Sequence, residues 1–211
     1  MSRSAAVTPG AARPRWSYDG FFIGGEWVAP IGDGVEEITS PATEEVVATI
    51  PSATERDAER ALRAARSAFD DGPWRHLSAA RRADGVRRLA AAFASRIEEM
   101  TAAYTAESGA PIGASRAMHE RVAGYWTRAA DLATHFSFEE LRGWPQGDGR
   151  ARMILTPSGV GVGIQPFNGP VSTAAQKAAA ALVAGCTFVL KPALENPTTM
   201  MMLADAVAEA D

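Results

Sequence analysis

The chain has 211 residues, of which 46% are apolar, so it can bury a sizeable core in one large domain or in parts of two. Its net charge of −4 argues against a nucleic-acid-binding surface, and no apolar run approaches the length of a membrane span. A single cysteine, Cys186, excludes an internal disulfide, and residues 1–16 lack an apolar core of signal-peptide length, so the cytoplasm is the expected location.

The first third of the chain predicts a leader, short strands and one helix. Residues 1–19 are expected to form a loose leader, residues 21–28 a hairpin around Gly24 and Gly25, and residues 45–50 another strand. Thr54 and Asp57 have the spacing of a capping box and predict the start of a helix. Its expected inner face consists of Ala58, Ala61, Leu62, Ala65, Ala68 and Phe69.

Two longer helices are predicted next, separated by a break at residues 109–111. The first begins after Ser78 and carries Val86, Leu89, Ala90, Phe93, Ile97 and Met100 at helical spacing. The second is expected to turn inward Met118, Val122, Tyr125, Trp126, Ala129, Leu132 and Phe136. Residues 143–149 then form a polar turn between two extended arms, and Arg81, Arg82, Arg87 and Arg88 are expected on a solvated face.

A strand–helix–strand unit follows at residues 160–190. Residues 160–165 predict a strand buried on both faces, and Pro170 suits the first turn of a helix that Gly185 ends. Residues 187–190 predict a second buried strand, and a crossover of this length implies that the two strands are parallel. Ligands bind such sheets at the carboxyl ends of the strands, where Asn168 and Lys191 lie.

Three motifs in this unit resemble those that begin the cofactor site of aldehyde dehydrogenases. They are Pro-x-Gly-Val at residues 157–160, Ile-x-Pro-Phe-Asn-x-Pro at residues 164–170, and Gly-x-x-x-Val-x-Lys-Pro at residues 185–192. Weaker phrases in the family's order extend the resemblance over residues 20–211, such as Phe-Ile-Gly-Gly-Glu-Trp at residues 22–27. The resemblance implies an α/β fold with a partial Rossmann-like cofactor-binding domain and the first arm of an oligomerisation hairpin.

The resemblance also divides the chain into domains. It places an incomplete cofactor-binding domain at residues 20–139 and 158–211 and the first hairpin arm at residues 140–157, and it implies that the catalytic domain is absent. The chain ends at Asp211, inside a helix expected to begin near Thr198 and before the family's nucleophilic cysteine and general-base glutamate. We therefore expect an N-terminal fragment of an NAD(P)-dependent aldehyde dehydrogenase that is inactive on its own.

The expected full-length enzyme would oxidise a small-molecule aldehyde to a carboxylic acid through a cysteine thiohemiacetal, as a homodimer or homotetramer. An alternative remains open, in which the chain is a non-catalytic short nucleotide-binding or interaction protein derived from that family. Neither interpretation involves a nucleic acid or a membrane.

The resemblance assigns roles to five residues. Asn168 matches the asparagine that stabilises the oxyanion of the thiohemiacetal, for which a fixed donor is the chemical requirement. Lys191 matches the lysine that binds the adenosine ribose, and Ile164, Pro166, Phe167 and Asn168 would flank the cofactor. Without the motif, Asn168 would be taken as a turn or helix-capping residue, Lys191 as a solvated strand-end lysine, and Ile164, Pro166 and Phe167 as ordinary core and turn.

The remaining candidates are weaker. Leu194 stands where NAD-preferring members carry a glutamate, so the cofactor is NAD or NADP. Cys186 is expected to be a buried structural thiol, and Lys177 either faces the site or extends to solvent. The glycines at positions 159, 161 and 163 lie inside a strand and therefore form no phosphate loop. His76, His119 and His135 lack metal-ligand spacing, so they are expected to be surface or locally bonded histidines, and no metal site is expected.

Overall fold

The computed structural model describes residues 14–143 and 145–210. Most of the expected leader, residues 1–13, lies outside the described residues. The expectation of a loose leader is wrong at its end, because β1 (Trp16–Ser17) pairs in parallel with β5 (Val46–Pro51). Trp16 is buried there, and the burial of its large indole stabilises this short pairing.

The N-terminal strands otherwise follow the prediction, with one addition. β2 (Phe21–Ile23) and β3 (Glu26–Val28) form the expected hairpin, and Gly24 and Gly25 adopt the positive φ that its turn requires. The strand β4 (Val35–Thr39), which the sequence had not revealed, pairs antiparallel with β5. Its exposed positions Val35 and Glu37 explain the weak sequence signal.

Helix α1 (Glu55–Asp70) begins at the capping box that the sequence predicted. The Thr54 side chain accepts from the Asp57 backbone, and the Asp57 carboxylate accepts from the Thr54 backbone at 2.9 Å. The expected inner face is only partly correct, since Phe69 is buried but Leu62 is exposed. Helix α1 packs mainly on two strands that follow later in the chain, β8 (Val160–Ile164) and β9 (Thr187–Lys191), and these contacts leave part of its apolar face uncovered.

The chain then passes through a short 3₁₀ turn (Trp74–His76) into α2 (Ala79–Ser95), α3 (Ile97–Ser108) and α4 (Ile112–His135). Ser78 caps α2 as expected, but the single helix predicted through Met100 is interrupted at Arg96, where φ is −103° and ψ is 2°. The interruption starts a new helix axis, and Met100 on α3 is fully buried. Arg96 itself is partly buried and pairs with Glu209 on the last helix.

Two apolar side chains at the C-terminal end and C-cap of α4 do not face inward. The buried stripe runs through Ser115, His119, Val122, Trp126, Ala130 and Ala133, at spacings of three and four residues. Leu132 and Phe136 lie off this stripe and are 65% and 47% exposed, so their predicted burial is wrong. The large apolar residues had suggested that the buried face of α4 continues through Leu132 and Phe136. At the C-terminal end of the helix, the buried face is instead formed by the small residues Ala130 and Ala133.

The arginines of α2 also depart from the expectation at one position. Arg82 is buried, and its Nε donates to the Val183 carbonyl at 2.8 Å. Burial lowers the pKa of this guanidinium below its ordinary value. Arg82 therefore ties α2 to the end of α5 instead of joining a solvated face.

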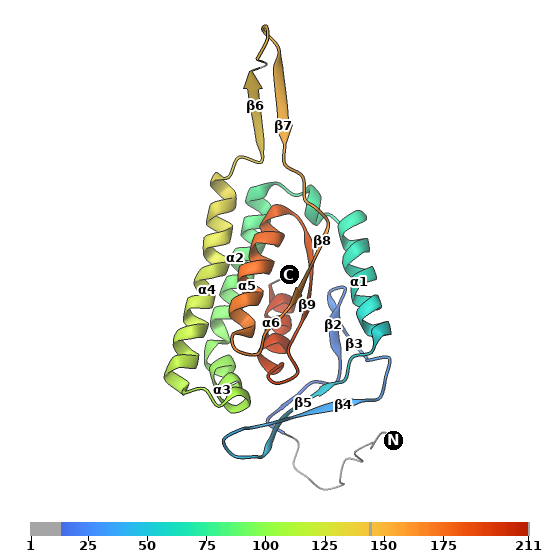
Figure 1. Ribbon diagram of the computed structural model, residues 1–211, viewed down its shortest axis with the longest axis vertical. Helices are drawn as coiled ribbons and strands as arrows, with labels where there is room; N and C mark the ends of the chain where they lie inside the picture. Colours follow the sequence, from blue (N-terminus) through green and yellow to red (C-terminus); the bar gives the residue numbers. More distant parts are fainter. Residues whose placement is uncertain (1–13, 144, 211) are drawn as a thin grey trace.

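The predicted strand–helix–strand unit is present. β8 (Val160–Ile164) and β9 (Thr187–Lys191) are parallel, with Val160 opposite Thr187 and Ile164 opposite Lys191, and α5 (Pro170–Ala184) connects them. Gly185 ends α5 in the left-handed conformation, as expected. The two strands lie between α5 on one side and α1 on the other (Figure 1).

The two faces of this sheet are not equally covered. On the α5 face, a Cβ at Gly161 would lie 2.5 Å from the Phe188 ring, so glycine permits close packing there. On the opposite face, α1 accepts a hydrogen bond from Thr187 at 2.8 Å, but Val162 and Ile164 further along β8 are 55% and 69% exposed. The expectation of burial on both faces is therefore wrong, because α1 covers only the beginning of the strands.

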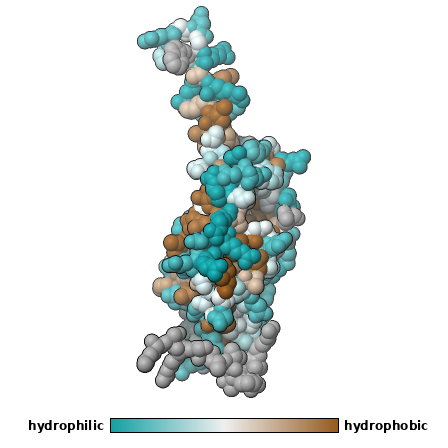
Figure 2. Space-filling model, turned by 90° about the vertical axis from the view of Figure 1, so that its right-hand side faces the viewer, coloured by the Kyte–Doolittle hydropathy of each residue, from teal (hydrophilic) through white to brown (hydrophobic). Residues whose placement is uncertain are grey.

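A hairpin projects from one end of the molecule (Figure 1). It consists of β6 (Glu139–Gly143) and β7 (Arg150–Ile154), which pair antiparallel, with Gly143 opposite Arg150. The two extended arms predicted on either side of residues 143–149 are confirmed, whereas the family resemblance had implied that residues 140–157 contribute only the first arm of an oligomerisation hairpin. Figure 2 shows the same projection from the side on which α1 lies, with brown apolar patches beside teal polar surface.

The last helix, α6 (Thr198–Glu209), begins where the sequence predicted, and Met200, Met201 and Met202 pack inward. The core lies between the helices α2, α4, α5 and α6, and Phe93, Trp126, Val171 and Met202 are among its buried residues. Within the described ranges, no helix is both long and apolar enough to cross a membrane.

Candidate cofactor and oxyanion site at the ends of β8 and β9

The candidate site consists of two turns that leave neighbouring strands at one edge of the sheet. The turn at residues 165–169 follows β8, and the loop at residues 192–197 follows β9. The Gln165 N–H donates to the Lys191 carbonyl at 2.9 Å, which extends the ladder by one bond and holds the two turns together. Asn168 and Lys191 are therefore at the same edge, as the sequence predicted for the ends of parallel strands.

Asn168 is exposed in the first turn and does not cap the helix that follows. The N-cap of α5 is Gly169, and no side chain caps this helix. Pro170 occupies the first turn, where its missing N–H is not needed. The helix-capping interpretation of Asn168 thus lacks support in the structure, and its side chain is exposed beyond the end of β8.

Lys191 ends β9 on the face of the sheet that α1 leaves open. It is exposed, and its Nζ donates to the adjacent Pro192 carbonyl at 2.8 Å. Ile164 is its partner in the ladder, so both side chains are on the same face. The other apolar groups at this edge, Phe167 and Leu194, are 59% and 57% exposed. A lysine ammonium thus lies beside an uncovered apolar surface, an arrangement that suits a ligand with both flat rings and hydroxyl groups.

Buried polar side chains that the sequence interpretation missed support the first turn from below. Gln165 is buried, and its Oε1 accepts from Thr173 on α5 at 2.6 Å. Asn196, which is 1% exposed, donates from Nδ2 to the Phe167 carbonyl at 2.6 Å. The turn that carries Asn168 is therefore fixed on both sides by side chains from α5 and from the loop after β9.

The second turn is anchored by a buried carboxylate on α3. Glu107 Oε1 accepts from the Thr198 backbone N–H at 3.2 Å and from the Thr198 hydroxyl. Burial raises the pKa of Glu107 to about 7, although both bonds from Thr198 oppose this effect. The sequence gave no signal for this contact, because the two residues are separated by 91 positions.

Cys186 lies at the wrong end of β9 to act with Asn168. It is 7% exposed, directly before the first residue of the strand, and its Sγ is 3.8 Å from the Ser158 hydroxyl. The expectation of a buried structural thiol agrees with this position. Lys177 is exposed on α5, and His119 is fully buried with its Nδ1 2.7 Å from the Ser115 carbonyl. Among the described residues, no three His, Cys, Asp or Glu side chains are grouped to hold a metal.

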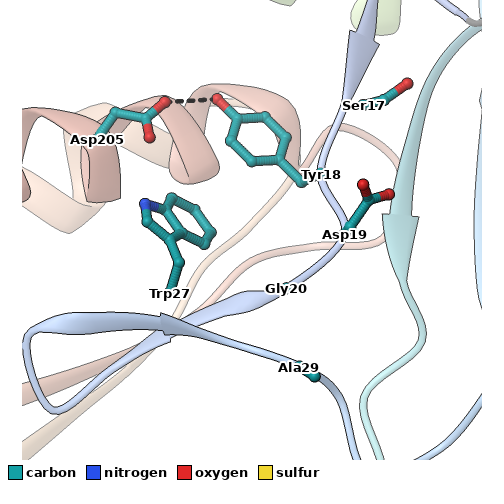
Figure 3. Close-up of a pocket in the computed structure, with 7 residues that line it drawn as sticks. All are labelled: Ser17, Tyr18, Asp19, Gly20, Trp27, Ala29 and Asp205. Atoms are coloured by element: carbon teal, nitrogen blue, oxygen red, sulfur yellow. Dashed lines mark hydrogen bonds between the residues drawn. The ribbon is translucent and has the colours of Figure 1, made fainter.

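A cavity of about 440 Å³ elsewhere in the molecule is not part of this site (Figure 3). It is lined by Ser17, Tyr18, Asp19, Gly20, Trp27, Ala29 and Asp205. The Tyr18 hydroxyl donates to Asp205 at 2.8 Å, and Trp27 stacks on the Tyr18 ring at 5.4 Å between centroids. Burial raises the pKa of Tyr18, so its hydroxyl stays protonated and committed to Asp205. The cavity shares no lining residue with the two turns.

Comparison with known proteins gives one consistent result. Residues 27–211 match the model of the "Aldehyde dehydrogenase family". A 3-succinoylsemialdehyde-pyridine dehydrogenase from Pseudomonas sp is 37% identical over 189 residues, which are 89% of this chain and 38% of that protein.

Solved structures agree. The structure of an NAD-dependent aldehyde dehydrogenase from Sinorhizobium meliloti superposes with a TM-score of 0.88 at 32% identity, covering 94% of this chain and 39% of that one. An aldehyde dehydrogenase from Mycobacterium tuberculosis, complexed with NAD+, superposes with a TM-score of 0.85 at 35% identity, covering 94% and 41%. The chain thus spans about two fifths of the length of the proteins it matches, in their N-terminal portion.

Proposed function

Because this chain belongs to the aldehyde dehydrogenase family, we propose that its two turns form part of the site of an NAD(P)-dependent enzyme that oxidises an aldehyde to a carboxylic acid. The observation that carries the proposal is that Asn168 and Lys191 follow or end neighbouring strands at one open edge, next to the exposed side chains of Ile164 and Phe167. The catalytic nucleophile and base would belong to a longer protein that includes these residues.

The donor set at this edge fits a nicotinamide dinucleotide. Lys191 can exchange the Pro192 carbonyl for the hydroxyls of a ribose at little cost, because its present bond is exposed to solvent and joins it only to the next residue. Ile164, Pro166 and Phe167 offer exposed apolar contact for the flat parts of the cofactor. When bound, the dinucleotide supplies the acceptor for the hydride that leaves the substrate.

Asn168 supplies a donor for the reacting carbonyl. When a cysteine thiolate adds to the aldehyde carbon, the carbonyl oxygen becomes an alkoxide, and an amide N–H fixed beside it stabilises the developing charge. The turn suits this role because Gln165 and the Phe167 carbonyl, on either side of Pro166, are both held by hydrogen bonds from other elements. A donor held in place before the reaction needs no reorganisation when the charge appears.

The choice between NAD and NADP depends in part on the absence of a carboxylate at position 194, close to Lys191 in the chain. Leu194, which is exposed, has no carboxylate that could accept from a ribose 2′-hydroxyl or repel a 2′-phosphate. Glu195 is also exposed but is one residue further along the loop. We therefore infer that this edge discriminates weakly between the two cofactors.

The remaining assignments are parts of the same proposal. Residues 20–139 and 158–211 would belong to the cofactor-binding domain, and the projecting hairpin of β6 and β7 would contact a second copy in a homodimer or homotetramer. A reducing location, such as the cytoplasm, suits a chain with one buried cysteine. The substrate would be a small-molecule aldehyde.

The test is an assay of the complete enzyme with aldehydes and with NAD or NADP, in which the absorbance of the reduced nicotinamide measures turnover. We expect turnover by the complete enzyme and none by residues 1–211 alone, since Cys186 is buried away from Asn168. Aldehyde oxidation by residues 1–211 above a control without protein would contradict the division of roles. A complete enzyme that reduces neither cofactor with any aldehyde would contradict the function.

A further inference from the structure

The chain has two asparagines, Asn168 and Asn196, and both interact with the Phe167–Asn168 peptide group, one as part of it and the other by a hydrogen bond. Asn168 supplies the nitrogen of the Phe167–Asn168 peptide, and Asn196 donates to its oxygen at 2.6 Å. One asparagine is exposed at the open edge, whereas the other is 1% exposed beneath the turn. The buried side chain therefore reaches the backbone immediately before the exposed one.

The geometry of a trans peptide makes this contact directional. The carbonyl and N–H bonds of one trans peptide point in opposite directions, and the described residues include no cis peptide. Because Asn196 holds the Phe167 oxygen inward, the N–H of Asn168 must point outward. The same bond restricts rotation of the peptide plane, which limits where the Asn168 Cα, and with it the base of its side chain, can lie.

The loop that carries Asn196 is itself held in place. Thr198, two residues later, is bonded through its backbone and hydroxyl to Glu107 on α3. The Oδ1 atom of Asn196 has no partner among the described residues, so the bond to Phe167 is what fixes the orientation of the buried amide. Removing this bond would leave the Phe167 carbonyl without its donor from the chain, and the turn could then rotate so that water replaces the lost bond.

We propose that Asn196 is a positioning residue for Asn168: it fixes the Phe167–Asn168 peptide so that both the backbone N–H and the side-chain amide of Asn168 point to the open edge. The inference rests on the proposed role of Asn168 for its catalytic consequence, but the orientation of the turn does not depend on that role. Asn196 touches neither substrate nor cofactor in this account and acts only through the turn.

The chain offers an unusually clean test of the orientation. Labelling with ¹⁵N-asparagine gives nuclear magnetic resonance signals from only two backbone amides and two side-chain amides. In the parent chain, the Asn196 side-chain protons should exchange with water far more slowly than those of exposed Asn168. Equal exchange rates would overturn the proposal, and this measurement needs no variant.

Variants then test the effect on Asn168. Asn196→Asp keeps the size of the side chain but removes the amide donor, and Asn196→Ala removes the polar group. In both, the order parameter of the Asn168 backbone N–H should fall from about 0.85, typical of rigid backbone, to below about 0.6. Thr101→Val is the control, because Thr101 is also buried and its hydroxyl has no partner among the described residues. It should leave the Asn168 signal unchanged.

The catalytic arm uses the complete enzyme. Asn196→Ala should lower kcat by roughly 10- to 100-fold, the range expected when a catalytic group is misplaced by about 1 Å, with little change in the KM for the cofactor. An unchanged kcat and an unchanged Asn168 order parameter in a folded Asn196→Ala would overturn the proposal. A parent enzyme without aldehyde activity would refute the proposed function alone, because the labelled chain still decides whether Asn196 orders the turn.

Discussion

Replacing Glu107 with glutamine should remove a large pH dependence of stability. The carboxyl is buried on α3, and burial raises its pKa from 4.5 to about 7. Between these two values, the folded state keeps a proton that the unfolded chain has already lost. The free energy of unfolding must therefore fall as the pH rises from 4.5 to 7, and it should level off above that range.

The magnitude follows from the difference of about 2.5 between the two pKa values. Each pH unit corresponds to 1.36 kcal/mol, so ionising Glu107 should cost roughly 3 kcal/mol of stability. A buried histidine acts in the opposite direction. Burial lowers the pKa of His119 below 6.5, so its contribution to stability increases as the pH rises towards that value. The parent chain alone therefore shows the sum of both effects.

The assay measures the free energy of unfolding in urea for the parent and for Glu107→Gln, with tryptophan fluorescence as the readout, at intervals from pH 4.5 to 8. Subtracting the two series cancels His119 and leaves the contribution of Glu107. We expect the parent to lose roughly 3 kcal/mol relative to the variant across this range, with most of the loss complete near pH 7. Parallel curves for the two proteins would refute the assignment of a buried, late-ionising carboxyl.

Four further predictions concern Asn168, Lys191, Leu194 and Cys186, and all apply to the complete enzyme. Asn168→Ala should lower kcat by roughly 10²- to 10³-fold with little change in cofactor affinity, and a near-normal kcat in steady-state assays would remove its oxyanion role. Lys191→Ala should weaken cofactor binding by roughly 1.5–3 kcal/mol in titration calorimetry, and unchanged binding would mean that Lys191 does not contact the ribose. Leu194→Glu should raise the ratio of kcat/KM for NAD to that for NADP; a ratio that does not move would show that other residues set the preference. Cys186→Ser should keep appreciable activity, and a folded but inactive variant would reverse the structural interpretation of that thiol.

The unit at residues 160–191 could be predicted because its signals are local. Pro170 and Gly185 mark the two ends of a helix by their backbone preferences, and the short apolar runs on either side allow only strands. Once the strands are parallel, Asn168 and Lys191 must be at the same edge. The local sequence signals are therefore enough to place Asn168 and Lys191 at the same edge of the sheet.

The errors arose where burial depends on neighbours. Val162 and Ile164 have the composition of strand residues buried on both faces, yet they are exposed because α1 covers only the start of the strands. Leu132 and Phe136 fit an apolar stripe on α4, but small alanines carry the packed side. Sequence periodicity identifies a helix, whereas the width and direction of its buried face depend on what packs against it.

The residues that support the site could not be identified from the sequence. Asn196 contacts the backbone 29 positions earlier, and Glu107 contacts a threonine 91 positions later. Neither contact leaves a periodic or local pattern. What Asn196 and Glu107 share is that each is a polar side chain buried in the fold, and this burial can be recognised only from the three-dimensional structure.

The most direct measurement is a crystal structure of the complete enzyme with NAD and with an aldehyde bound covalently to its catalytic cysteine. We predict that Lys191 Nζ has left the Pro192 carbonyl and lies within about 3 Å of a ribose hydroxyl, and that an Asn168 N–H lies at a similar distance from the substrate oxygen. A dinucleotide bound away from the ends of β8 and β9, for example in the cavity beside Tyr18 and Trp27, would contradict it.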